Sequence, residues 1–587
     1  MNPFRSQTSL SGLTWAVKEP DEQVVQRLTA RLGVSDIVAR VLVGRGIAPD
    51  DADSFLYPTL KNHLPNPLTL TDMERAAARI ADAVCAGGPI GVMGDYDVDG
   101  ATSTAILKLF LEKCGAPVLT FIPEREDGYG PNAGKMAEFK AAGCALVITA
   151  DCGTTSFEAV EAGNACGLDV VILDHHDAEA KLPPAYAVVN PKRLDEDTGH
   201  PCRHLAAVGV VFLAVIAVNT MLRNRGFYAG KTEPNLMSFL DLVALGTVCD
   251  VVKLQGINRL LVKAGLNQMR LGQNQGIAAL ARLVNLSEPP TTYHLGYIFG
   301  PRINACGRVG KSDTGMRLLT CADAVTADIL ARELEDLNAL RRDIESEVYL
   351  AAVAQVEQNP PQHPFIVVRG DGWHQGVVGI VAGRLKERYN LPVFALSVDG
   401  NEVKGSSRSV TGVDLGTLVM NALGKGILSR GGGHPMAAGF TLKKENLPAF
   451  EQYLTEQITP EKCRAAPSIL EADGILHMNG ITPELAADID KIAPFGEANP
   501  EPKFIVKDVN IIRTTLLKNG HISCILSAAD GGATIQSIAF RAEDTPMGRV
   551  MLAPKGQRVH IFGTLKKDSW RGREKIQIQI IDMMAAD

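Results

Sequence analysis

The sequence lacks the features that mark disulfide-rich, zinc-binding and membrane-spanning proteins. Its eleven cysteines are an odd number, and no two of them form a C-x-x-C pair. This usage predicts reduced thiols in a reducing compartment, without a disulfide framework or a structural zinc site. The longest apolar run, residues 205–218, is too short to cross a bilayer and predicts a buried core helix.

An excess of positive charge and low-complexity tracts are missing as well. The net charge is −7, so any nucleic-acid-binding surface has to be local. Residues 1–15 have no apolar core of the kind found in signal peptides, which favours the cytoplasm and no membrane association. A content of 46% hydrophobic and 21% charged residues is typical of a soluble globular protein. The length predicts roughly three or four domains.

Three carboxylates alternate directly after a predicted buried strand at residues 90–93. They are Asp95, Asp97 and Asp99, and a glycine and a predicted helix follow them. Alternate residues of an extended segment point the same way, and like charges repel unless a cation lies among them. An acidic turn in which Asp99 caps the helix is the alternative. A calcium loop is less favoured, because Ile106 stands where its bidentate Glu is required.

From residue 90 to about residue 266, apolar strands, short polar loops and helices alternate, which predicts a doubly wound parallel α/β sheet. Two further strand-like runs, residues 145–149 and 170–173, end in Asp151 and in Asp174-His175-His176, and a fourth apolar run ends in Asp250. Ligands bind outside the carboxyl ends of such strands. Four acidic segment ends, one with two histidines, therefore predict a metal site.

The ligand types narrow the choice of ion. Asp and His without Cys favour Mg²⁺ or Mn²⁺. So many carboxylates suit two ions bridged by a shared Asp, an arrangement that activates water and neutralises a phosphate. Adjacent histidines rarely bind one ion together, so we expect one of the pair to be a ligand and the other to face the substrate.

At this point the sequence resembles a known family. GDYDVDG (residues 94–100), DCG (151–153), DHH (174–176) and ALGTVCD (244–250) are similar to the four ordered motifs of the DHH phosphoesterase family. The length and the later motifs resemble its RecJ branch, the single-strand-specific DNA exonucleases.

The resemblance implies a centre for two ions. In it, Asp97 and Asp99 serve the two ions, Asp151 bridges them, and His175 and Asp250 complete the second. His176 would face the scissile phosphate. Asp95 would be a ligand or support one, since Met93 stands where smaller family members have a histidine.

Two further stretches are candidates for substrate binding. Residues 121–130 carry Arg125 and Tyr129, and residues 300–308 carry Arg302, Asn304 and Arg308. The planar fork of arginine can make two hydrogen bonds to one phosphate. Solvated surface loops are the alternative, but the second stretch is similar to the R-I-N-A-x-G-R segment of RecJ-like proteins.

Residues 321–358 predict one long amphipathic connecting helix, and residues 362 to about 460 predict a second α/β unit with strands at 365–368 and 393–396. We expect GSSRS (405–409) and GGGHPMAAG (431–439) to be Gly-rich loops. With the W-H-x-G-V-V-G-I segment they resemble a DHHA1 domain, which holds the substrate across a cleft. The resemblance implies that Ser406 and Arg408 bind a terminal phosphate and that His434 contacts the sugar–phosphate backbone of the substrate, with His374 as a further substrate-binding residue. Turn glycines and structural histidines are the alternative.

The last part of the chain predicts a small barrel of the OB type, with strands at residues 504–512, 521–527, 533–540, 558–564 and 576–583. Residues 501–587 hold 13 Lys and Arg against 9 Asp and Glu, a local charge of +4. The hairpin tip 565–575 places a tryptophan among cations: Lys566, Lys567, Trp570, Arg571, Arg573 and Lys575. Cations that follow phosphates and a ring that stacks on a base suit a single strand, although a solvated hairpin remains the alternative.

The expected domains are an N-terminal helical segment (1–86), a DHH catalytic domain (87–315), a connecting helix (316–360), a DHHA1-type domain (361–462) and an OB domain (463–587). The resemblance implies a 5′→3′ exonuclease for single-stranded DNA that uses two Mn²⁺ or Mg²⁺ ions, releases 5′-mononucleotides and acts in DNA repair and recombination. A small-substrate phosphoesterase and a non-catalytic nucleic-acid-binding protein are the other hypotheses. A helicase and a single-strand-binding protein are plausible partners, although no residue shows them.

Overall fold

The computed structural model describes residues 4, 7–125, 128, 130–463, 469–553, 558–568 and 575–586. The chain divides into two compact units. Unit 1 comprises Met1–Leu64, Lys253–Leu260 and Ala466–Asp587, and unit 2 comprises Pro65–Val252 and Leu261–Ala465. The segment predicted over residues 1–86 is therefore shared between the two units.

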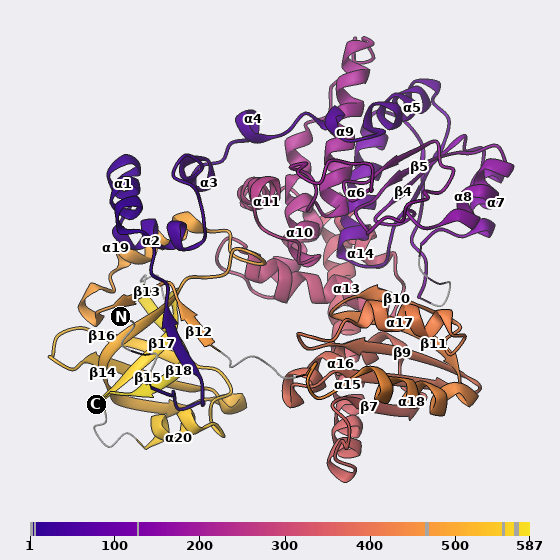
Figure 1. Ribbon diagram of the computed structural model, residues 1–587. Helices are drawn as coiled ribbons and strands as arrows, with labels where there is room; N and C mark the ends of the chain where they lie inside the picture. Colours follow the sequence, from indigo (N-terminus) through magenta and orange to yellow (C-terminus); the bar gives the residue numbers. More distant parts are fainter. Residues whose placement is uncertain are drawn as a thin grey trace. The chain divides into compact units, whose positions relative to one another are not determined.

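Unit 2 begins with a parallel sheet made of β2 (Ile90–Met93), β3 (Val118–Phe121), β4 (Leu146–Ala150), β5 (Asp169–Leu173) and β6 (Ala187–Val189). The strand order is β3-β2-β4-β5-β6, and all neighbours run parallel. Helices α5 (Met73–Ala86), α6 (Val98–Lys113) and α9 (Ala207–Asn224) pack on one side, and α7 (Ala133–Ala141) and α8 (Phe157–Ala165) on the other (Figure 1). The predicted doubly wound sheet is confirmed.

Two apolar runs of this region form helices. Residues 205–218 contribute to α9, as predicted. Among the described residues, α9 is the one helix long and apolar enough to cross a membrane, but 72% of it is buried inside the structure, so it is weak evidence for a span. The apolar run before Asp250 is α10 (Leu240–Cys249), which packs on α6 and α9 rather than adding a strand to the sheet.

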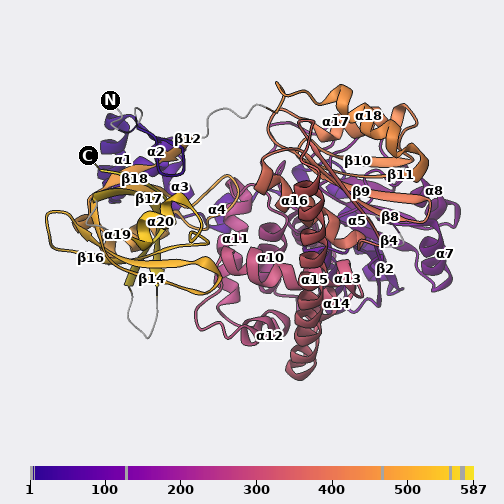
Figure 2. The ribbon, with the colours of Figure 1, turned by 90° about the horizontal axis from the view of Figure 1, so that it is seen from below.

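Unit 2 continues with helices that lead to a long connector. They are η2 (Leu236–Phe239), α11 (Gly256–Met269, which starts in unit 1), α12 (Gln275–Leu283), the π-helix His294–Phe299, α13 (Gly300–Val309), α14 (Thr314–Thr320) and α15 (Ala324–Gln358). Figure 2 shows α15 as one long rod. The predicted connecting helix is confirmed, and α15 packs against α12, α13 and α14.

The second α/β part of unit 2 contains β7 (Ile366–Asp371), β8 (Val393–Asp399), β9 (Glu402–Arg408), β10 (Arg430–His434) and β11 (Ala437–Lys443), with α16 (Gln375–Tyr389), α17 (Leu415–Gly424), η4 (Lys444–Asn446) and α18 (Leu447–Gln457). The strand order is β10-β11-β9-β8-β7. The prediction of Gly-rich loops was wrong, because β9 and the β10–β11 hairpin occupy these stretches. Packing requires the small residues: a Cβ on Gly405 would lie 2.3 Å from the Phe440 ring.

Unit 1 contains a closed barrel of β14 (Lys503–Leu516), β15 (Ile522–Ala528), β16 (Thr534–Ala539), β17 (Arg558–Asp568) and β18 (Lys575–Ala585). The strands pair in the order β14-β15-β16-β18-β17, and β17 pairs with β14 again. This confirms the OB-type barrel. Apolar side chains of every strand fill its core.

Of the N-terminal residues, Phe4 and Trp15 pack on this barrel, against Ile505 and Phe562. The N-terminal elements are β1 (Thr14–Val17), α1 (Glu22–Leu32), α2 (Asp36–Gly44), α3 (Ala52–Leu56) and α4 (Leu60–His63), with η1 (Pro67–Thr69) following in unit 2. Strand β1 pairs with β12 (Ile469–Ala472), and the buried Trp15 donates a hydrogen bond of 2.9 Å to Asp582. The remaining elements are β13 (Gly474–Leu476), η5 (Met478–Gly480), α19 (Pro483–Ile489), η6 (Asp490–Ile492), η7 (Lys518–Gly520) and α20 (Pro546–Leu552).

Candidate metal centre and phosphate site

The strand order brings the predicted acidic segments to one edge of the parallel sheet. From β2 the chain crosses through α6 to β3 on one side, while β4 lies on the other side of β2. The carboxyl ends of β2 and β4 therefore flank a topological switch point, where such sheets bind ligands. Asp95 follows β2, and Asp151 follows β4.

The turn after β2 is shaped by hydrogen bonds and a close backbone approach. Asp97 is the N-cap of α6 and accepts a hydrogen bond of 3.0 Å from the Gly100 N–H. A Cβ on Gly100 would lie 2.4 Å from the Asp95 carbonyl oxygen, so only glycine fits there. Asp99 is buried, and its two oxygens accept N–H groups of α9, from Ala207 at 2.7 Å and Val208 at 2.9 Å. Asp99 therefore caps α9 rather than the helix that follows it.

Asp151 adopts a left-handed backbone conformation, with φ of 63°. Residues other than glycine rarely take it, and such strain gathers at functional sites. The conformation comes directly at the end of β4, where the chain leaves the sheet.

His175 lies among three carboxylates. Its Nε2 atom is 3.3 Å from Asp151 Oδ1, 3.6 Å from Asp250 Oδ2 and 3.8 Å from Asp99 Oδ2. Its Nδ1 atom lies 3.1 Å from the Leu205 carbonyl oxygen, which orients the ring so that Nε2 faces the carboxylates. Burial lowers the pKa of His175 to about 3, so the ring is neutral and able to bind a metal through a nitrogen lone pair.

Three groups of possible ligand atoms each lie within 4.8 Å; Asp151, His175 and His176 form one, which overlaps two further groups that share no residue with each other. Of these two, one consists of Asp95, Asp97 and Asp151, and the other of Asp99, His175 and Asp250. His175 lies next to Asp151, so the two groups adjoin. Asp250 comes from the C-cap of helix α10 and not from a strand end.

The electrostatics of the cluster favour a cation. Burial, reinforced by neighbouring carboxylates, raises the pKa of Asp95 and Asp151 well above the usual range and that of Asp250 to about 9. The same causes raise the pKa of Asp99 to about 7. Within the described residues, the buried atoms Asp95 Oδ1 and Asp250 Oδ2 accept no hydrogen bond. Hard oxygen donors with one imidazole fit Mg²⁺ or Mn²⁺.

Asp174 belongs to the site; the sequence marked it only as the acidic end of a strand and gave it no role of its own. Its carboxylate accepts N–H groups from Thr154 at 3.0 Å and His175 at 2.7 Å, and it lies 2.8 Å from His176 Nδ1. Burial opposes its charge, but the hydrogen bond from His176 keeps the pKa of Asp174 below its usual range. Burial would lower the pKa of His176, but the bond to Asp174 raises it to about 9. The position of Asp174 at the end of β5 was the signal for it.

A second group of side chains gathers beside this cluster. The Arg125 guanidinium lies 4.4 Å from the Tyr96 ring centroid and donates to the Gly307 carbonyl at 3.0 Å. Arg308 donates to the Gly376 carbonyl at 2.9 Å. Burial, followed by repulsion from Arg125, lowers the pKa of Arg308 to about 10. Two adjacent guanidiniums favour an anion between them.

Ser406 and Arg408 belong to β9 and lie beside Gly379 in the second turn of α16. Arg408 donates to the Ser406 hydroxyl at 3.3 Å, and a Cβ on Gly379 would lie 2.9 Å from Ser406 Oγ and 3.3 Å from Arg408 Nη2. Arg408 is also close enough to Arg308 to lower its pKa further. The predicted phosphate residues Arg125, Ser406 and Arg408 therefore lie with Arg308 near a helix N-terminus, a favourable place for phosphate.

Other predicted residues have structural partners instead. Arg302 lies 2.5 Å from Glu335 of α15 and donates to the Ile298 carbonyl. Asn304 accepts the Val98 N–H at 3.2 Å, which fixes α13 against α6.

The remaining candidates include one residue beside the arginine group, His374, which bonds to the same Gly376 that Arg308 contacts. His374 caps α16 by accepting the Gly376 N–H at 3.1 Å, and the exposed His434 lies 3.3 Å from Asp177. Lys566 and Lys567 form ion pairs with Glu501 and Asp490. Tyr129, Trp570, Arg571 and Arg573 lie outside the described residues.

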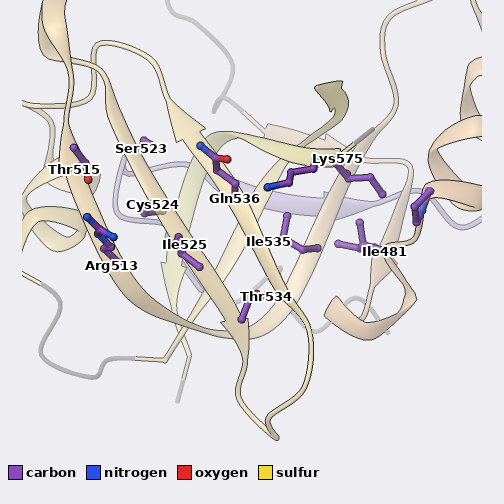
Figure 3. Close-up of a pocket in the computed structure, with 12 residues that line it drawn as sticks. Ile481, Arg513, Thr515, Ser523, Cys524, Ile525, Thr534, Ile535, Gln536 and Lys575 are labelled. Atoms are coloured by element: carbon purple, nitrogen blue, oxygen red, sulfur yellow. The ribbon is translucent and has the colours of Figure 1, made fainter. Parts of the chain in front are cut away.

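The barrel carries a hollow of about 550 Å³ on the outer face of β14, β15 and β16. Figure 3 shows Arg513 and Thr515 on one side of it and Lys575 on the other. Between them lie Ser523, Gln536 and the apolar Ile525. Sequence reasoning missed this hollow and found only Lys575 at its rim.

The fold and the carboxylate–imidazole cluster define a phosphoesterase of the DHH class. The family model described as "DHH family, N-terminal domain" matches residues 89–247, the DHHA1 domain matches 362–459, and the RecJ OB domain matches 472–582.

Full-length relatives narrow the class. The chain is 34% identical over 568 residues to the single-stranded-DNA-specific exonuclease RecJ of Escherichia coli, covering 93% of this chain and 95% of that protein. It is 32% identical to the RecJ of Bacillus subtilis, covering 98% and 71%. The crystal structure of Thermus thermophilus RecJ in complex with Mn²⁺ matches with a TM-score of 0.80 at 29% identity, covering 98% of this chain and 80% of that chain. The chain belongs to the RecJ family.

Proposed function

We propose that this protein is a metal-dependent exonuclease that degrades single-stranded DNA from its 5′ end and releases 5′-mononucleotides. The observation that carries the proposal is the position of Arg125 beside Tyr96 and Asp95 of the buried carboxylate–histidine cluster, with Arg308 and Arg408 in the same arginine group. The RecJ proteins of E. coli and B. subtilis are named for activity on single-stranded DNA, and T. thermophilus RecJ structures contain Mn²⁺ or Mg²⁺. A role in DNA repair and recombination, in the cytoplasm, fits this activity.

The two ligand groups would each hold one divalent ion, with Asp151 between them. When bound, the ions activate water for attack on phosphorus and neutralise charge on the phosphate. Asp95 and Asp97 would hold one ion, and Asp99, His175 and Asp250 the other. Asp174 orients His176, whose ring would donate a hydrogen bond to an oxygen of the scissile phosphate.

The arginine group would determine that the strand is degraded from its 5′ end. A 5′-terminal phosphate carries more charge than an internal phosphodiester and can accept several hydrogen bonds at once. Arg125, Ser406 and Arg408 would bind it, with Arg308 adding charge. Only a strand that begins at this group would place its first internal phosphate at the ions.

The barrel would bind another part of the same strand. Arg513 and Lys575 frame a hollow with polar and apolar lining, which suits phosphates and bases of a flexible strand. A helicase or a single-strand-binding protein would supply unpaired ends as a partner.

The decisive experiment uses strands labelled at either end, with Mn²⁺ or Mg²⁺ added in turn. We expect labelled mononucleotide at once from the 5′ label and only late from the 3′ label. Asp151→Ala should abolish hydrolysis but leave binding of the strand largely intact. Turnover of this variant near the wild-type rate would refute the two-ion assignment. Equal hydrolysis of a 5′-phosphorylated dinucleotide and a long strand would favour a small-substrate phosphoesterase instead.

A further inference from the structure

Two tyrosines form an exposed stacked pair in unit 2. The rings of Tyr293 and Tyr297 have centroids 5.2 Å apart and an interplanar angle of 29°. Their exposed fractions are 56% and 72%, so each presents much of its surface to solvent. Aromatic rings dominate binding energetics where they are exposed together, because they bury a large area on contact at little cost in conformational freedom.

The pair lies on an unusual element that is attached to the metal centre. The π-helix His294–Phe299 carries Tyr297, and π-helical turns occur mainly at functional sites. Cys249, the residue before Asp250, donates through Sγ to the Leu295 carbonyl at 3.3 Å. A Cβ on Gly300 would lie 2.6 Å from Cys249 Sγ. The tyrosine pair is therefore fixed to the segment that bears Asp250.

The residue after Asp250 adds a second unusual feature. Val251 is 66% exposed and has φ of 57°. A β-branched residue in this region is strained, and such strain persists where the surroundings impose it, often at ligand sites.

The other end of the same helical segment reaches the arginine group. Helix α13 continues directly from the π-helix, and a Cβ on Gly307 would lie 2.5 Å from the Tyr96 carbonyl oxygen. Arg308 follows at once. Arg308 lies eleven positions after Tyr297, roughly 16 Å at the helical rise. The segment thus runs past the metal centre, from the side of Asp250 to the side of Asp95.

We propose that Tyr293 and Tyr297 form a stacking site for bases on the 3′ side of the scissile phosphate. The inference rests on the proposed function, which places the 5′ phosphate at the opposite end of this segment. A strand that starts at Arg308 and crosses the metal centre leaves on the side of the tyrosines. Its unpaired bases stack on the exposed rings, and stacking of this kind tolerates any sequence.

The test compares a long 5′-phosphorylated strand with a 5′-phosphorylated dinucleotide, which is too short to reach the tyrosines. In the variant Tyr293→Ala/Tyr297→Ala, the ratio of the KM for the long strand to the KM for the dinucleotide rises about tenfold. Tyr293→Phe/Tyr297→Phe, which keeps both rings, restores the wild-type ratio. Leu350→Ala removes an exposed side chain on α15 and serves as the matched control.

A second measurement locates the stacked bases in the wild-type protein before any variant is used. Single abasic sites are moved along the long strand, and the wild-type protein loses affinity at the positions that stack. At those positions the double alanine variant shows no additional loss, because base and ring act as a pair. The stacking site is refuted if the KM ratio is unchanged and the affinity lost through an abasic site adds to the affinity lost through the tyrosine substitutions. Failure of the wild-type protein to cleave either substrate instead overturns the proposed function.

Discussion

Asp250 is a buried carboxyl in a place where its charge is unfavourable without a cation. Burial, Asp99 and Asp97 together raise its pKa to about 9, so at neutral pH it carries a proton when no metal is bound. Metal binding must displace that proton, and metal affinity therefore rises with pH. Asp250 thus lowers the stability of the metal-free protein, and it stabilises the metal-bound protein as a ligand.

The variant Asp250→Asn separates these two effects. In EDTA at pH 8 we expect the variant to be more stable than the wild type by about 2 kcal/mol. The unfolded wild type is stabilised by ionisation of Asp250, and asparagine cannot ionise. Addition of Mn²⁺ raises the unfolding temperature of the wild type but hardly that of the variant, since a ligand is lost. Calorimetry with and without Mn²⁺ measures both. A variant less stable in EDTA yet equally stabilised by Mn²⁺ would contradict the ligand role.

Asp174 acts on His176 through a hydrogen bond and a charge. Asp174→Asn can keep an oxygen for the His175 N–H, but it loses the second oxygen, which accepts the Thr154 N–H, and the charge that holds the His176 ring. We expect kcat to fall about 10- to 100-fold with little change in KM, as for other supports of metal-site histidines. Steady-state kinetics on a labelled strand give both values. The exposed Asp343→Asn is the control, and an unchanged kcat would show that His176 does not need Asp174.

At the scale of elements, α10 and α13 set the geometry of the site. Helix α10 ends at Asp250, and α13 carries Arg308 on a side that faces α16 and Arg302 on a side that faces α15. The first turn of α10 contains another buried carboxyl, Asp241, whose pKa burial raises to about 7.

Asp241 makes the stability of the protein depend on pH. Its folded-state pKa lies above the unfolded value, so its contribution is fully present below about pH 4 and is lost as the pH rises through 7. Between pH 5 and pH 8 we expect the wild type to lose about 3 kcal/mol relative to Asp241→Asn. Asparagine keeps the acceptor for the Leu242 N–H. Urea denaturation across this range tests the difference, and parallel pH curves would exclude it.

At the scale of the whole molecule, three distant parts of the chain build unit 1. The buried Arg259 joins them: it donates to the carbonyls of Phe55 at 2.9 Å, Ala493 at 2.8 Å and Pro494 at 3.4 Å. Its guanidinium also lies 3.9 Å from the Phe55 ring centroid. One side chain from the segment 253–260 thus ties the N-terminal helices to the residues before the barrel.

Arg259→Met should weaken unit 1 selectively. It removes the guanidinium donor from the partly buried carbonyls of Phe55 and Ala493, while the Pro494 carbonyl keeps the donor Asn499 Nδ2; the loss costs about 2–4 kcal/mol in total. In hydrogen exchange we expect faster opening of the barrel strands and unchanged protection of β2, β4 and β5 in unit 2. The exposed Arg27→Met serves as the control in the same unit. Equal weakening of both units would mean that they unfold together.

Much of the fold followed from local patterns. The strands β2, β4 and β5, the long helix α15 and the five barrel strands lie close to where hydrophobic periodicity predicted them. The carboxylates at the strand ends were readable too, because a parallel sheet brings the ends of its strands to one edge whatever the loops do. These features depend on the spacing of residues along the chain, which can be read directly from the sequence.

Only the tertiary structure decided which groups meet. Asp99 finds its partners in α9, 108 and 109 positions away, and Asp250 enters the cluster from a helix. The Gly-rich stretch around Gly405 is a strand because it pairs with β8 and β11, and Gly405 itself leaves room for the Phe440 ring. Arg302 and Arg308 are arginines of the same short stretch. Arg302 forms an ion pair with Glu335, whereas Arg308 donates to the Gly376 carbonyl in the second α/β part. The spacing of residues determines on which face of a helix or strand a side chain lies. The packing of the elements determines which side chain from another element contacts it.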